Sequence, residues 1–131
     1  MKSLSLIPAF ILVLASSQPA HAQCGCDFTI PNSANTVHFD GVAQGVQPGD
    51  VICLSAGNIA RISFTNIKGS PTNYVTIQNC GGQSLVGNSS ANSAILFSNS
   101  QFFRLTGTGD PSFQYGIKVP ETKPSGAQGV S

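Results

Sequence analysis

The feature that most constrains the fold of this 131-residue chain is its division into short segments of alternating apolar and polar residues. After residue 22, glycine, proline or asparagine interrupts every window before apolar residues recur at helical spacing over three turns. Alternation with a period of two is typical of half-buried β-strands, because successive side chains point to opposite faces. The sequence therefore predicts short strands at 51–54, 61–64, 74–78, 94–97, 103–106 and 115–119.

Several of these segments resemble one another along the chain. Residues 62–66 and 95–99 share the pattern Ile-x-Phe-Thr/Ser-Asn. Residues 75–79 have the same shape as residues 52–56, which come before them, and as residues 103–107, which come after them. Repeats of about 20 to 50 residues built from short strands indicate a solenoid, so we predict an all-β, right-handed parallel β-helix of about three coils.

In such a fold each coil stacks on the next, and like charges would repel along the axis. Charged residues make up only 8% of the chain, which fits this requirement. Asparagines that close strands are predicted to form turns, because asparagine tolerates the left-handed backbone region; they are Asn66, Asn79 and Asn99. The alternating pattern predicts one inner apolar column made of Ile52, Leu54, Val75, Ile77 and Leu105.

An antiparallel β-sandwich would accommodate the same strands. Tight hairpins would favour Asn-Gly or Asp-Gly between paired strands, but Asp40-Gly41 precedes the first predicted strand. The offsets between repeats vary, so a β-helix requires loops of different lengths at its turns. We prefer the β-helix.

The N-terminus predicts a secretion signal. Lys2 supplies a positive charge, residues 4–15 are apolar, and Ala20-His21-Ala22 is a small-x-small cleavage motif. A membrane anchor is the alternative, but twelve residues span only about 18 Å, against about 30 Å for a bilayer core. We predict removal of residues 1–22, a secreted, periplasmic or cell-surface location, and no membrane span in the mature chain.

Four cysteines follow this signal, and an exported chain meets an oxidising environment in which thiols pair. Cys24 and Cys26 are too close for an ordinary bridge to each other, so each is expected to reach a partner such as Cys53 or Cys80, in a connectivity that the sequence leaves open. A zinc site is one alternative, although the paired C-x-x-C spacing and a nearby histidine are missing. Buried free thiols at Cys53 and Cys80 are another.

A family resemblance is carried by residues 45–57, which read Gly-Val-Gln-Pro-Gly-Asp-Val-Ile-Cys-Leu-Ser-Ala-Gly. This run resembles the first coil of extracellular right-handed parallel β-helix proteins, the pectate-lyase-like superfamily, in which a Pro-Gly-Asp turn opens a strand that ends in Ala-Gly. Residues 64–69, 74–82 and 102–118 are similar to later coils of bacterial members. The resemblance implies the fold, but such folds host lyases, hydrolases, epimerases and adhesins, so it does not fix an activity.

These observations predict the organisation of the chain. A signal peptide at 1–22 is followed by an N-terminal cap region with the cysteine pair at 23–50, parallel β-helix coils at 51–119, and a turn-rich loop at 120–131. Three coils are near the minimum for a continuous core, and members of the family are longer. We therefore expect the N-terminal portion of a larger β-helix, with the loop at 120–131 as the truncation point.

No catalytic cluster is visible in the sequence. Lyases of the resembled family use a lysine or arginine to take a proton beside a carboxyl group, with Ca²⁺ held by clustered acids. The acids here are scattered and show no metal site in this portion, so the cofactor is left open, with Ca²⁺ as the candidate in the full-length protein; the acids are Asp27, Asp40, Asp50, Asp110 and Glu121. Asp50 and Asp110 are predicted to be turn residues.

The basic side chains give no stronger signal. Arg104 and Lys118 alternate with apolar neighbours and are expected to point outward, where they would meet a glycan or, as we prefer, solvent. Arg61 and Lys68 also lie in or beside strands, and we prefer the solvated interpretation for them too. His38 has no nucleophile motif near it, and Asn88-Ser89-Ser90 is a glycosylation sequon.

The sequence therefore predicts the N-terminal part of a secreted, monomeric β-helix that acts on or binds extracellular polysaccharide. A lyase or a glycoside hydrolase is expected if the protein is an enzyme. The alternatives are a non-catalytic adhesion or structural β-helix and a small, complete, disulfide-stapled domain. A net charge of +1 does not indicate a nucleic-acid partner.

Overall fold

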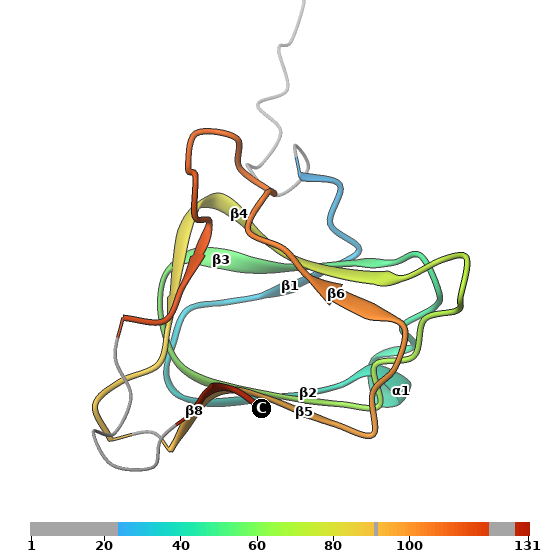
Figure 1. The fold of residues 1–131 in the computed structure, drawn as a ribbon, viewed down its shortest axis with the longest axis horizontal. Helices are drawn as coiled ribbons and strands as arrows, with labels where there is room; N and C mark the ends of the chain where they lie inside the picture. Colours follow the sequence, from blue (N-terminus) through green and yellow to red (C-terminus); the bar gives the residue numbers. More distant parts are fainter. Residues whose placement is uncertain (1–23, 91, 121–127) are drawn as a thin grey trace, which may run out of the picture.

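The computed structural model describes residues 24–90, 92–120 and 128–131, in which the chain forms a parallel β-solenoid of about three turns (Figure 1). Every strand pair in this part of the chain is parallel. The elements are β1 (Phe28–Ile30), β2 (Ser33–Asp40), α1 (Gly41–Gln44), β3 (Val51–Thr65), β4 (Val75–Val86), β5 (Ser93–Ser98), β6 (Phe103–Leu105), β7 (Ile117–Lys118) and β8 (Gln128–Val130). This confirms the predicted all-β solenoid, and the sandwich is excluded.

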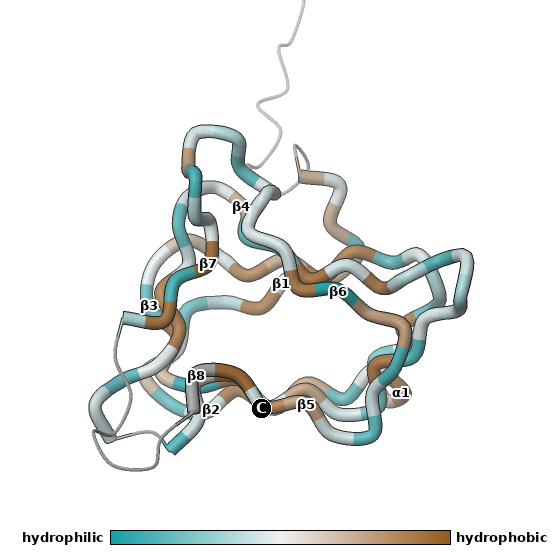
Figure 2. The backbone as a smooth tube through the Cα atoms, in the orientation of Figure 1, coloured by the Kyte–Doolittle hydropathy of each residue, from teal (hydrophilic) through white to brown (hydrophobic). Residues whose placement is uncertain are grey.

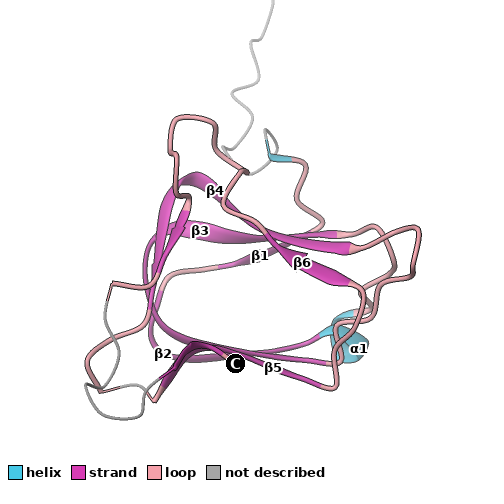
Figure 3. Cartoon of the chain, in the orientation of Figure 1, coloured by secondary structure: helices cyan, strands magenta, loops and turns pink. Residues whose placement is uncertain are grey.

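The strands form the sides of a coil that is seen nearly end-on in Figure 3. On one side, β1, the first part of β3, the first part of β4 and β6 are stacked. On the opposite side, β2, the end of β3, β5 and β8 are stacked. β3 runs from the first of these sides to the other without interruption, so the predicted strands at 51–54 and 61–64 are one bent strand.

The register between turns confirms two of the predicted repeats and corrects the third. Ile62 pairs with Ile95, as the shared Ile-x-Phe pattern predicts. Val75 pairs with Phe103, also as predicted. Ile52, however, pairs with Ile77 and not with Val75, so the true register is displaced by two positions from the predicted one. Such a displacement keeps every side chain on its predicted face, which is why the alternating pattern did not reveal it.

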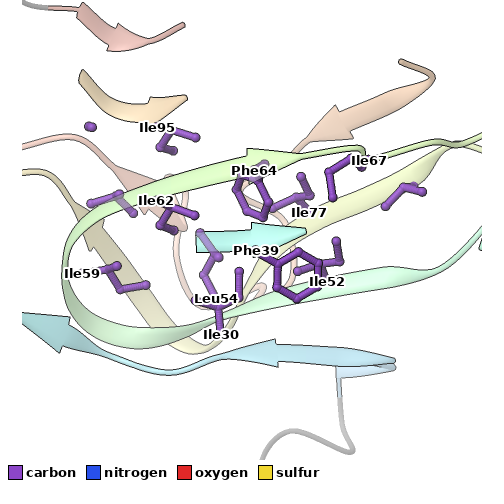
Figure 4. Packing of buried hydrophobic residues seen from close by; sticks show 13 residues of the cluster. Ile30, Phe39, Ile52, Leu54, Ile59, Ile62, Phe64, Ile67, Ile77 and Ile95 are labelled. Carbon is purple, nitrogen blue, oxygen red and sulfur yellow. The ribbon is translucent and has the colours of Figure 1, made fainter. Parts of the chain in front are cut away.

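All five residues predicted for the inner column do face the interior, as Figure 4 shows for Ile52, Leu54 and Ile77. Four of them are fully buried, and Leu105 is partly buried. The register divides them between neighbouring columns, because Leu54 pairs with Asn79 and Val75 with Phe103. One column consists of Phe28, Ile52, Ile77 and Leu105. Figure 2 shows the alternation of apolar and polar residues along the strands.

A ladder of phenylalanines extends this core along the axis. Phe39, Phe64 and Phe97 occupy the same register position in successive turns. The rings of Phe64 and Phe97 are stacked with centroids 5.1 Å apart, and those of Phe97 and Phe103 are 4.2 Å apart. Phe39 lies on β2, so the segment 23–50, expected to be a cap, already contains the first turn of the solenoid.

The predicted turn asparagines divide into two groups. Asn66 and Asn99 adopt left-handed backbone conformations with φ of 56° and 48°, as predicted. Asn79 does not: it lies fully buried inside β4, and the left-handed residues there are Gly81 and Gly82. The Nδ2 of Asn79 donates to Gly82 O at 2.8 Å, and this bond satisfies part of the hydrogen-bonding capacity of the buried amide.

The C-terminal segment also departs from prediction. The predicted loop at 120–131 contains β8, in which Gln128 pairs with Ser93 and Val130 with Ile95. Glu121, most of that loop and the predicted signal peptide at 1–22 lie outside the described residues. Among the residues described, no helix has the length and hydropathy needed to cross a membrane.

The buried column predicts a sharp difference between inner and outer strand positions. Ile77→Ala should lower the free energy of unfolding by about 2–5 kcal/mol, because Ile77 is fully buried and leaves a cavity. The exposed Lys118→Ala should change it by less than about 0.5 kcal/mol. Denaturant unfolding of both variants measures the difference, and equal losses would mean that the strand faces are wrongly assigned.

Candidate functional site

An open groove lies between β2, β3 and the loop that connects β4 to β5. The corner of the coil where these segments meet is at the lower left of Figure 1. Its volume is about 330 Å³. The residues that line it are neutral and small or polar except for one arginine: Ala34, Asn35, Thr36, Ala60, Arg61, Asn88, Ser90 and Asn92.

Two irregularities in the stacking form this groove. The β2–β3 register shifts between Ser33 and Thr36, so β2 carries an extra residue where β3 runs straight. On the other side, β3 needs only Ala60 and Arg61 to pass from Ile59 to Ile62, whereas the next turn uses residues 87–94 for the same passage. The bulge and the longer loop are therefore the two walls, and Ala60 and Arg61 are the floor. Bulges are frequent beside binding sites, where they redirect side chains.

Arg61 is the charged residue of this groove. It lies on the outer face of β3 between the buried Ile59 and Ile62, opposite Thr36 of β2. Its Nε is buried and has no hydrogen-bond partner among the residues that the structure describes. The side chain as a whole is half-buried, so the solvated interpretation stays a prediction for the rest of the guanidinium and does not describe this N–H. A buried donor without an acceptor costs about 1–3 kcal/mol. Because the half-buried Arg61 lines the groove, its side chain is the charged group that an incoming acceptor would meet there.

The acidic side chains of the described residues are used in local structure. Asp27 Oδ2 accepts from Val51 N at 2.8 Å, which joins the N-terminal segment to β3. Asp50 accepts from Gln47 N and Asp110 from Ser112 N, so both are turn residues as predicted. The fourth acid, Asp40, caps α1. None of these four lines the groove.

Asp40 is also the first member of a polar ladder at one corner of the coil. Both of its carboxylate oxygens accept from Asn66 Nδ2 at 3.2 Å. Asn66 Oδ1 accepts from Asn99 Nδ2, and Asn99 Oδ1 accepts from Lys68 Nζ at 3.0 Å. The bond from Asn66, together with the N–H groups of Ala43 and Val42, lowers the pKa of Asp40 below its ordinary value of 3.8. The ladder stabilises this corner of the coil, and Lys68 is part of it through its hydrogen bond to Asn99.

The remaining basic residues lie outside the groove. Arg104 and Lys118 are exposed, as predicted. The Nε of Arg104 on β6 donates to Thr76 Oγ1 on the adjacent strand β4 at 2.9 Å. His38 is exposed on β2. The structure therefore does not bring these basic residues together, and Arg61 differs from the others because it lines the groove.

The cysteine connectivity that the sequence left open is Cys24–Cys80 and Cys26–Cys53, with Cα atoms 5.9 and 5.7 Å apart. Both bridges join residues before β1 to the long strands β3 and β4. Two disulfides of this kind are typical of an oxidising, extracellular-type environment. In the described part of the chain, cysteine sulfurs are also the one grouping of three or more potential metal-ligand atoms.

Sequence reasoning misses the polar walls of the groove. It identifies Asn88 and Ser90 only as part of a glycosylation sequon, and it places Asn35 and Thr36 in a cap region. The available signal is the run Asn-Ser-Ser-Ala-Asn-Ser at 88–93, which is longer than the matching passage in the preceding turn. Its position opposite Arg61 depends on the register, which no local pattern supplies.

Comparisons with protein families, with curated proteins and with solved structures found no match to this chain.

The polar ladder predicts a change in titration. Asn66→Gly removes the amide while retaining the left-handed backbone, so the pKa of Asp40 should rise part of the way to 3.8, the two backbone N–H donors remaining. NMR titration of the Asp40 carboxyl measures this. The lowered pKa of Asp40 stabilises the fold above pH 3.8, and this stabilisation is lost as the pH falls through the lowered value. The free energy of unfolding of the variant should therefore fall less on acidification than that of the wild type. An unchanged titration would contradict the assigned hydrogen bonds.

Proposed function

We propose that this β-solenoid is an extracellular protein that binds polysaccharide in the groove around Arg61. The observation that carries the proposal is the position of Arg61 in a groove whose other polar side chains are amides and hydroxyls; within the described part of the chain its Nε has no hydrogen-bond partner. The two disulfides support an extracellular location, and the resemblance of residues 45–57 to pectate-lyase-like β-helices supports a glycan as the ligand.

The lining provides the two kinds of contact that an acidic sugar requires. A guanidinium offers five N–H donors in a planar fork that matches a carboxylate or a sulfate. The side chains of Asn35, Asn88 and Asn92 supply both donors and acceptors, which suits sugar hydroxyls. We therefore favour a polysaccharide that carries carboxylate or sulfate groups.

Binding is favoured over cleavage by the position of the acids. Lyases of the resembled family combine an arginine or lysine base with acids that hold Ca²⁺, and glycoside hydrolysis requires a pair of carboxyl groups beside the scissile sugar. No acidic side chain of the described residues lines the groove, and the four described acids make the local hydrogen bonds given above.

The proposal predicts a charge-specific loss of binding. The purified secreted protein should bind pectin, alginate or chondroitin sulfate more tightly than neutral dextran in affinity electrophoresis. Arg61→Gln should weaken this binding at least about tenfold, because a bond between two charged groups contributes about 1.5–3 kcal/mol. Arg104→Gln is the matched control and should leave binding unchanged, since Arg104 bonds Thr76 away from the groove.

A second variant separates shape from charge. Ala34 is exposed on the bulge, so Ala34→Trp should fill the groove without disturbing the core, and it should abolish binding. Equal binding by wild-type protein and both groove variants would overturn the proposal. The same samples, assayed for new unsaturated or reducing ends, should show none; turnover that Arg61→Gln abolishes would make the groove catalytic.

A further inference from the structure

The groove around Arg61 borders an outer face of the coil that is formed by β2, the end of β3 and β5, on the lower side of Figure 1. The bulge in β2 ends at Thr36, and the longer loop ends before Ile95, where β5 is paired with β3. Beyond these points the register is regular, with Asp40 still opposite Thr65. A ligand longer than the groove can therefore continue from Arg61 over regularly stacked strands.

His38 is the next outward residue of β2 after the groove. Alternation along β2 places Val37 against the core and Thr36 and His38 on the outer face. Thr36 lies opposite Arg61, and His38 lies opposite Ser63. Two residues along a strand span about 6.6 Å and adjacent strands are about 4.8 Å apart, so the Cα atoms of His38 and Arg61 are about 8 Å apart. The exposed His38 is thus within reach of a ligand that contacts Arg61.

This position suggests a second, switchable contact for an acidic ligand. We propose, on the basis of the function proposed above, that protonated His38 binds the same acidic polysaccharide as Arg61, so that binding tightens in mildly acidic surroundings. Histidine is the side chain whose charge normally changes between about pH 5 and 8. Protonation adds a positive charge and makes both ring nitrogens donors, whereas the neutral ring offers a single N–H.

The charged groups around His38 leave it as the one that titrates in this range. Of the elements that contact β2, β3 carries Arg61 as its single charged residue and α1 carries none. Asp40 follows His38 on the same face, but its pKa lies below 3.8, so it stays ionised. The oxygens of Asp40 accept from Asn66 and from N–H groups of α1. In the sequence after residue 22, His38 is also the one histidine.

The test measures binding of dextran sulfate, whose sulfate groups stay ionised throughout, so that only the protein titrates. The disulfide-bonded wild type should bind it about two- to fivefold more tightly at pH 5.5 than at pH 7.5, as expected for one exposed ion pair. His38→Gln should abolish this gain. Because His38 is exposed, the substitution should leave the Tm unchanged, which controls for folding.

Two lysine variants separate the position of the charge from its amount. His38→Lys should bind at pH 7.5 as tightly as the wild type binds at pH 5.5, and its binding should not depend on pH in this range. Tyr115→Lys adds the same charge at an exposed position on the loop between β6 and β7, away from β2, and should bind like the wild type at both pH values.

The outcomes distinguish this inference from the proposed function. If Arg61→Gln weakens binding but the wild type shows no pH effect, or His38→Gln retains it, the inference alone is overturned. Equal gains from His38→Lys and Tyr115→Lys would also overturn it, because net charge would then be the cause. No binding at either pH, or binding that Arg61→Gln leaves unchanged, would overturn the proposed function and this inference with it.

Discussion

The structure depends on parallel stacking of each turn on the next in register. Ile62 over Ile95 and Phe64 over Phe97 are in register as neighbouring residues of parallel strands, so that backbone hydrogen bonds and apolar packing act on the same residues. This constraint explains the composition, because a residue type that occupies the same register position in successive turns must pack favourably against a second copy of itself. Phenylalanine, isoleucine and asparagine do so, and charged residues do not.

The candidate groove arises where that stacking is interrupted. The inner faces cannot change without opening the core, but the outer corners accept extra residues at little cost, because a longer loop adds little closure entropy. One extra residue in β2 and the longer passage between β4 and β5 leave Arg61 half-buried on the floor of the groove. The fold thus keeps a regular core while it places a single cation among amides at one corner.

Periodicity in the sequence predicted which strand residues face the core, but the features that depend on the register between turns could not be predicted from it. The Ile-x-Phe repeat identified the pairing of residues 62 and 95, and alternation placed Ile52 and Ile77 inside. A slip of two positions preserves alternation, so the true partner of Ile52 could not be found in that way. Asn79 is typical of a turn by residue type, yet it lies in the core because Gly82 O and Gly109 N satisfy its amide. The groove joins segments that are distant along the chain, and only their stacking brings them together.

The most direct test of this account is NMR observation of the Arg61 Nε–H during addition of an acidic oligosaccharide. The described residues give this group no internal acceptor. The account predicts that the Arg61 signal shifts downfield and exchanges more slowly with water on binding, while the Arg104 signal, already bonded to Thr76, does not move. A shift at Arg104 with no change at Arg61 would contradict it, because the ligand would then bind the outer face of β4 and β6 and not the groove.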